Sequence, residues 1–74
     1  MQNENMVIMM NRIGDFFEVM PDRAGAEVDI ASHVRKFWAP SMRQALKKYL
    51  EQKKGEGLKP IILEALTKHE DKWL

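Results

Sequence analysis

The chain has 74 residues, of which 45% are hydrophobic and 31% are charged, and it contains no cysteine. This length predicts one domain, residues 1–74, and the composition is that of a folded protein. Without cysteine there are no disulfides or iron–sulfur ligands, and two histidines 36 positions apart are a poor zinc set. A domain this small is marginally stable alone, so it needs either unusually good helix packing or burial of one face against another chain, and the second route points toward a partner.

The net charge of +1 conceals an uneven distribution. Residues 1–34 carry two arginines against six acids, residues 35–59 carry eight cations against two glutamates, and residues 60–74 carry two lysines against three acids. A basic stretch of this kind attracts an acidic partner or phosphate, although a solvated helix face is the plainer interpretation. No segment resembles a secretion leader or a membrane span, so we expect a cytoplasmic protein without a membrane partner.

Apolar residues recur at three- and four-residue steps in the first quarter of the chain, which predicts an amphipathic first helix. They are Met6, Met9, Met10, Ile13, Phe16, Phe17 and Met20. Pro21 ends this helix because the residue before a proline is displaced from helical geometry. We interpret Met6, Met9 and Met42 as core residues, and we consider Met10 and Met20 as contact residues.

A loop at residues 22–25 precedes a second helix, which we expect over about residues 26–37. Two prolines then define the later helices, because proline is favoured at a first helical position. Pro40 begins a third helix, which Gly55 ends as a left-handed cap, and Pro60 begins a fourth. Residues 1–5 and 70–74 are expected to fray or, at the second end, to extend the fourth helix. The predicted fold is all-α, a small bundle of about four short helices joined by turns containing Pro and Gly.

No catalytic pattern emerges from the polar residues. Ser32 and His33 are adjacent on a helix and therefore point in different directions. The sequence Gly55-Glu56-Gly57 lacks the lysine and the preceding strand of a phosphate loop. His69-Glu70 has no second histidine four positions on, so it favours a surface histidine over a metal ligand. We expect a chain that is no enzyme and binds no cofactor or metal.

Phe37-Trp38 is the most distinctive local feature. Two large aromatic residues at one helix end cannot both point into so small a core, so one is expected to be covered by a neighbouring helix or a partner. Cations flank the pair, and Trp and Arg are enriched at interface hot spots. An alternative is that both rings hold the helices together. The candidate partner-binding residues are Arg35, Lys36, Phe37, Trp38, Pro40, Met42, Arg43 and Lys47.

The order and spacing of several motifs resemble the delta subunit of NAD-dependent formate dehydrogenase. The residues that carry the resemblance are Met9-Met10-Asn11-Arg12-Ile13, Phe16-Phe17, Pro21, Ile30-Ala31, His33-Val34-Arg35-Lys36-Phe37-Trp38, Pro40, Met42-Arg43, Leu46, Gly57-Leu58, Pro60 and Ala65-Leu66. They span roughly residues 9–66. The chain departs from the family pattern at Ala39, where an acid is usual, and at Ser41, where an arginine is usual. Since Ala39 cannot cap the third helix, we expect Ser41 or a neighbouring group to compensate.

The resemblance implies a non-catalytic accessory subunit of a cytoplasmic complex that oxidises formate and reduces NAD. In this family the alpha subunit holds a molybdenum or tungsten pterin centre and iron–sulfur clusters, and the beta and gamma subunits hold flavin and further clusters. The delta subunit is expected to bind the large catalytic subunit and to support assembly or stability of the complex. A free-standing homo-oligomer, in which Trp73 and exposed methionines bury against a second copy, is the second hypothesis. A small nucleic-acid-binding protein is the third, disfavoured by a nearly neutral charge.

Overall fold

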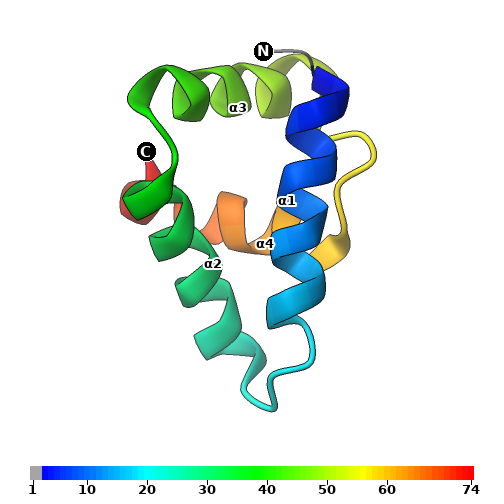
Figure 1. Ribbon diagram of the computed structural model, residues 1–74, viewed down its shortest axis with the longest axis vertical. Helices are drawn as coiled ribbons and strands as arrows, with labels where there is room; N and C mark the ends of the chain where they lie inside the picture. The colour runs from blue at the N-terminus through cyan, green and yellow to red at the C-terminus, as the bar shows by residue number, and fades with distance from the viewer. Residues whose placement is uncertain (1–2) are drawn as a thin grey trace.

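The computed structural model describes residues 3–74, which form five α-helices and no strand. The helices are α1 (Asn3–Phe17), α2 (Arg23–Phe37), α3 (Pro40–Lys53), α4 (Pro60–Lys68) and α5 (Glu70–Trp73). The predicted all-α class is confirmed. In Figure 1, α1 and α2 run in opposite directions, α3 crosses above them, and α4 lies behind. No helix in residues 3–74 has both the length and the apolar character needed to cross a membrane.

The connection between α1 and α2 lies about three residues earlier in the chain than the sequence predicted. The first helix stops at Phe17, four residues before Pro21, and the second begins at Arg23. The loop expected at residues 22–25 is therefore wrong, because Asp22 caps α2. Its side chain accepts a hydrogen bond from the Gly25 backbone N–H at 3.1 Å, which satisfies a donor at the helix start.

The prediction that prolines begin the third and fourth helices is confirmed at Pro40 and Pro60. Neither Ala39 nor Lys59, the two residues in the N-cap positions, makes a side-chain capping bond. Within residues 3–74 no side-chain capping bond is present at the start of α3, so the compensation expected from Ser41 or a neighbour is not observed there. At the other end of α3, Gly55 is left-handed as predicted, with φ 71°. The left-handed stretch starts one residue earlier, at Lys54, where φ is 58°.

The C-terminal segment corrects the expectation that residues 70–74 fray or extend α4. Residues 70–73 form the separate helix α5, which packs against α2 and α4. Trp73 has no exposed surface, and its indole N–H donates to the Leu66 carbonyl at 2.9 Å. This side chain is therefore part of the core and is not free to bury against a second copy. Residues 1–5 were also expected to fray. The structure places the chain from Asn3 onward in α1, and residues 1 and 2 lie outside the described part.

The core collects one face from each helix. Its buried members are Met6, Met10, Ala26, Ile30, Ala31, Val34, Trp38, Leu46, Tyr49, Leu58, Ile61, Ile62, Ala65, Leu66 and Trp73. Met10 is fully buried, so its interpretation as a contact residue is wrong. Met9 and Met42, which we interpreted as core residues, are half-buried and pack against this cluster. Met20 is 36% exposed beyond the end of α1.

A close approach between α1 and α4 fixes which side of α1 faces inward. Asn11 uses both ends of its amide: its Nδ2 donates to the Gly57 carbonyl, and its Oδ1 accepts from the Lys59 N–H, each at 2.9 Å. One turn later, Gly14 lets the helices meet, since a Cβ there would lie 3.0 Å from Ile62 Cγ1. With this side of α1 held against α4, its other side turns toward α2 and solvent.

Candidate interaction surfaces

Phe37 and Trp38 diverge at the end of α2. Phe37 is the last helical residue and is 71% exposed, whereas Trp38 is 7% exposed and belongs to the core. The backbone turns at Trp38 into an extended conformation, with φ −93° and ψ 135°, which separates the directions of the two side chains. The alternative in which both rings hold the helices together is therefore wrong for Phe37. Of the pair, only Phe37 is available to a partner in this conformation.

Three of the predicted contact cations bind the chain's own last helix. Arg35 donates to the Leu74 carbonyl at 3.0 Å, and Arg43 lies 3.5 Å from the Trp73 carbonyl. Lys47 forms an ion pair with Glu70 at 2.7 Å, and this hydrogen bond raises the pKa of Lys47. We call α5 with its buried Trp73, together with the three cations Arg35, Arg43 and Lys47 that bind it, the α5 clasp. Cations at the carbonyl end of a helix are placed where they stabilise it.

Three other predicted contact residues differ in their exposure. Pro40 is exposed at the start of α3, Lys36 is exposed on α2, and Met42 is half-buried against the core. Their role in binding a partner stays a prediction. The structure thus divides the predicted site into an inner part, which includes Trp38 and the clasp, and an outer part around Phe37.

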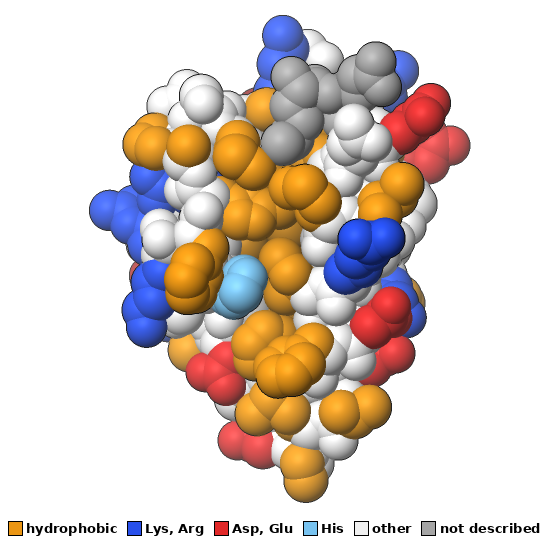
Figure 2. Space-filling view, viewed as in Figure 1, with side chains coloured by type: hydrophobic (Ala, Val, Ile, Leu, Met, Phe, Trp, Pro, Cys, Tyr) orange, Lys and Arg blue, Asp and Glu red, His pale blue; other side chains and the backbone are white. Residues whose placement is uncertain are grey.

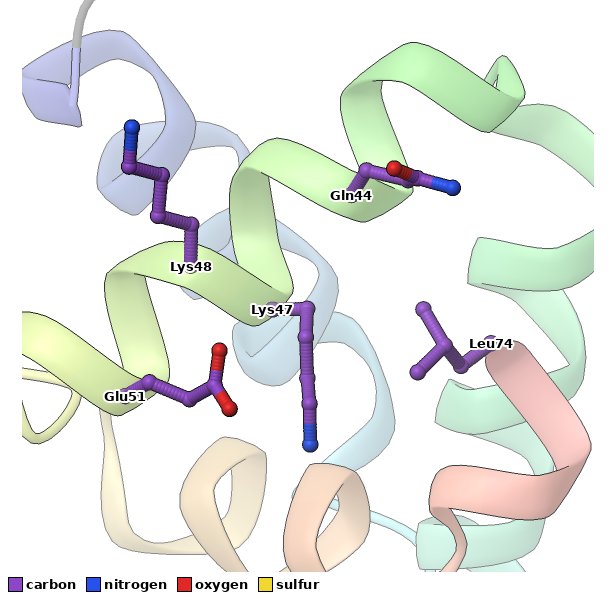
Figure 3. Close-up of a pocket in the computed structure, with 5 residues that line it drawn as sticks. All are labelled: Gln44, Lys47, Lys48, Glu51 and Leu74. Carbon is purple, nitrogen blue, oxygen red and sulfur yellow. The ribbon is translucent and has the colours of Figure 1, made fainter.

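A pocket of about 460 Å³ lies beside the clasp, between α3 and the last residue. Its lining residues are Gln44, Lys47, Lys48, Glu51 and Leu74. Figure 3 shows the Lys47 and Lys48 side chains leaving α3 in opposite directions, while Glu51 and Leu74 point toward Lys47. Because the two ammonium groups diverge and Lys47 is paired with Glu70, this pocket does not gather donors as a phosphate site requires.

An apolar surface occupies the open side of the molecule, between α1 and α2. We call it the aromatic groove, formed by Ile13, Phe16, Phe17, His33 and Phe37. The ring centroids of Phe16 and Phe17 are 5.0 Å apart, those of Phe17 and His33 are 6.3 Å apart, and those of His33 and Phe37 are 4.7 Å apart. Figure 2 shows a band of hydrophobic side chains running down this face, with the histidine at its edge.

The groove contains a hollow of about 250 Å³, which is lined by four of these residues together with Arg12. Phe16 is 70% exposed, and Val19, just past the end of α1, is 79% exposed. Monomeric soluble proteins rarely leave large contiguous apolar patches in water, and such patches mark binding sites. The exposed aromatic rings therefore make the groove the strongest candidate interaction surface of residues 3–74.

Sequence reasoning identified only Phe37 of this groove as a contact residue. It placed Phe16 and Phe17 together among the apolar positions of the first helix, but adjacent helical residues point about 100° apart. Phe17 faces α2 and is half-buried, whereas Phe16 points outward. The doubled aromatic pair was the available signal, since it widens an apolar stripe beyond what one helix contact covers.

Other polar clusters in residues 3–74 have structural explanations. No three His, Cys, Asp or Glu side chains there are close enough together to hold a metal ion. The buried Glu27 lies 3.6 Å from Arg23 and 3.5 Å from Lys68, a charge cluster that joins α2 to α4. His33 packs between Phe17 and Phe37, so it forms part of the groove wall.

Comparison with known families gives this architecture a context. Residues 5–66 match the family model described as NADH-dependent formate dehydrogenase delta subunit FdsD. The match contains all the residues of the aromatic groove and the Phe37-Trp38 segment, and it ends before α5. Neither the curated proteins nor the solved structures yielded a match. The matched segment covers most of the chain, and the chain therefore belongs to the FdsD family of formate dehydrogenase delta subunits.

Proposed function

We propose that this chain is a non-catalytic accessory subunit that binds the large catalytic subunit of a cytoplasmic, molybdenum- or tungsten-containing formate dehydrogenase. The observation that carries the proposal is the aromatic groove, an apolar surface left open in a chain of the delta-subunit family. Binding through this groove supports assembly or stability of the complex. The cofactors and the chemistry belong to the larger subunits, and this chain binds none of them.

The groove suits a protein partner better than a small molecule. Its hollow of about 250 Å³ is shallow and is lined by apolar rings with one flanking cation, Arg12. Small-molecule sites are usually larger and enclose most of their ligand, with several convergent polar groups. Exposed aromatic side chains instead contribute strongly to protein–protein affinity when a partner covers them.

Binding also gives a physical route to stabilisation of the large subunit. A partner that binds only the folded form of a protein shifts the folding equilibrium toward that form by mass action. The effect is mutual, so the small subunit gains stability from the same contact. In this proposal the delta subunit raises the amount of correctly assembled enzyme without touching the reacting atoms.

Co-purification tests the proposal directly. The full chain is expressed together with the large subunit, with an affinity tag on the large subunit, and the recovered ratio of the two is measured. We expect the wild-type chain to co-purify and the double variant Phe16→Ser, Phe37→Ser to be recovered at about a tenth of that amount or less, since two exposed aromatic anchors are removed.

Ile8→Ser is the matched control, because Ile8 is 51% exposed on α1 and borders a different hollow, beside Tyr49. Circular dichroism of each variant measures whether the helices are retained. Equal recovery of the wild-type chain and the groove variant would contradict this use of the groove. Absence of the wild-type chain from the purified large subunit would contradict the proposed function itself.

A homo-oligomer remains the second hypothesis, since the same exposed rings are available to another copy. Its support is now weaker, because Trp73 is buried within the chain. Sedimentation of the isolated protein distinguishes the two hypotheses. A stable dimer that the large subunit cannot dissociate favours the homo-oligomer.

A further inference from the structure

The shape of the aromatic groove indicates the kind of element that fills it. Two helices of 15 residues each, α1 and α2, lie side by side, and α4 closes the back. At 1.5 Å per residue each helix is about 22 Å long, which is about four helical turns. Two neighbouring helices present a furrow into which a third helix packs its side chains. Residues 3–74 contain no strand whose edge an extended peptide could join.

The charges at the groove indicate the chemistry of that helix. Arg12 borders the hollow from α1, and Lys36 lies one turn beyond His33 on α2. Neither cation forms an ion pair or a side-chain hydrogen bond within the described chain. Four other cations are paired with carboxylates, namely Arg23, Lys47, Lys59 and Lys68.

The acidic side chains near the groove are either occupied or at its far end. Asp15 and Glu18 on α1 both bind Lys59, at 2.7 and 3.2 Å, and so belong to the contact with α4. Asp29 lies one turn before His33, toward the loop between α1 and α2. The groove therefore has a cationic end near α3 and a weakly acidic end near that loop.

We propose that the aromatic groove receives an amphipathic helix of the large subunit that carries acidic residues beside its apolar stripe. Large apolar side chains at three- and four-residue steps enter the groove between Phe16 and Phe37. The acidic residues lie at the end that meets Arg12 and Lys36. The identity of the partner rests on the proposed function; the helical and acidic character rests on the form and charge of the groove.

A second copy of this chain fits the groove less well. In a symmetric dimer each copy presents the same patch to the other. If the hollow lined by Ile13, Phe17 and His33 lay on the symmetry axis, it would face its own copy and remain unfilled. A helix from another protein is convex and fills it.

Charge reversal tests the acidic character. The variant Arg12→Glu, Lys36→Glu and the control Lys48→Glu, Lys53→Glu change the net charge equally, and all four residues lack an ion pair among residues 3–74. We expect the first to weaken binding to the purified large subunit by about tenfold or more in 50 mM salt, with a smaller difference in 500 mM salt. The control is expected to change binding by less than about threefold. Equal losses in both variants would overturn the assignment of acidic residues to the groove.

Photo-crosslinking tests the identity and form of the occupant. The full chain carrying Phe37→p-benzoylphenylalanine is irradiated in its complex with the large subunit, and the joined peptide is identified by mass spectrometry. A helical, acidic segment of the large subunit supports the inference. A peptide of this chain itself, a segment without acids, a non-helical segment, or no crosslink while the Ile8→p-benzoylphenylalanine control reacts would each overturn it. Failure of the large subunit to bind wild-type chain is a separate outcome, which contradicts the proposed function.

Discussion

The α5 clasp and the aromatic groove combine the same kinds of side chain with opposite results. In the clasp, Trp73 is fully buried, and Arg35, Arg43 and Lys47 bind groups of the last helical turn and its neighbours. In the groove, Phe16 and Phe37 are about 70% exposed. One cluster of aromatic and cationic residues is thus satisfied within the chain, and the other is left open.

The difference lies in whether the chain itself provides a helix that covers the aromatic and cationic side chains. The helix α5 brings one large apolar side chain, Trp73, and one acid, Glu70, to a surface that holds cations. The groove presents apolar rings and two cations but receives no helix from residues 3–74. The clasp is therefore an internal example of the contact that we propose for the groove. Composition alone cannot distinguish the two, because aromatic and basic residues predict both.

The largest expected effect is on the clasp side. We expect Trp73→Ala to lower the free energy of unfolding by about 3–5 kcal/mol, because it leaves a cavity in a small core and removes the hydrogen bond to Leu66. Urea denaturation followed by circular dichroism measures the loss. Trp73→Phe keeps most of the volume and is expected to cost about 1–2 kcal/mol. If Trp73→Ala were as stable as the wild type, the conclusion that Trp73 of the clasp belongs to the stabilising core would be contradicted.

The adjacent residues Phe37 and Trp38 at the end of α2 provide the next test, because Trp38 is buried in the core and Phe37 belongs to the open groove. Trp38→Ala is expected to lower the free energy of unfolding by about 3 kcal/mol, since the ring is buried in the core. Phe37→Ala is expected to change it by less than about 0.5 kcal/mol, because its ring is mostly in water. The second variant should instead weaken co-purification with the large subunit. Equal effects on stability would remove the distinction between the two positions.

Much of the fold followed from local patterns. Pro40 and Pro60 have a fixed φ that suits a first helical position, so the starts of α3 and α4 were predicted to the residue. Gly55 was likewise predicted as left-handed. The start of α2 was missed although its signal is local: Asp22 is a favoured N-cap residue, and Gly25 provides the N–H that it accepts.

The features that sequence reasoning missed depend on contacts between distant residues. The segment Glu70–Trp73 is too short to show a helical repeat, and its structure comes from burial of Trp73 among α2 and α4. The cations Arg35 and Arg43 were assigned to a partner because nothing in their own neighbourhood reveals that α5 returns to them. The aromatic groove joins α1 to α2, so its rings become one surface only after the two helices pair.

A smaller effect on stability is expected when two cations are removed from the clasp or from the groove. The two double variants have the same net charge, so their free energies of unfolding can be compared directly. Arg35→Gln with Arg43→Gln is expected to lower the free energy of unfolding by about 1–2 kcal/mol, because two donors to the backbone of α5 are weakened. Arg12→Gln with Lys36→Gln is expected to leave it within about 0.5 kcal/mol. Urea denaturation of both variants at pH 7 makes the comparison. A larger loss in the groove variant would mean that its cations, too, are bound within the chain.

The smallest expected effect concerns the ion pair of the clasp at alkaline pH. The hydrogen bond to Glu70 raises the pKa of Lys47 above its usual value of 10.5. A raised folded-state pKa means that the protonated lysine stabilises the fold fully below about pH 10.5, and that this contribution disappears as the pH rises through the folded-state pKa. We therefore expect a small stability advantage of the wild type over Lys47→Met that is constant from pH 7 to about pH 10 and then decreases.

Thermal denaturation of both proteins between pH 7 and pH 11.5 measures this difference. Lys48→Met is the matched control, since Lys48 is the next residue on α3 and forms no ion pair within the described chain, so its difference from the wild type should not vary with pH in the same way. The pair is exposed to solvent, and added salt should reduce the advantage at every pH. An advantage of Lys47 that persists unchanged above pH 11 would show that its aliphatic chain stabilises the fold more than its charge does.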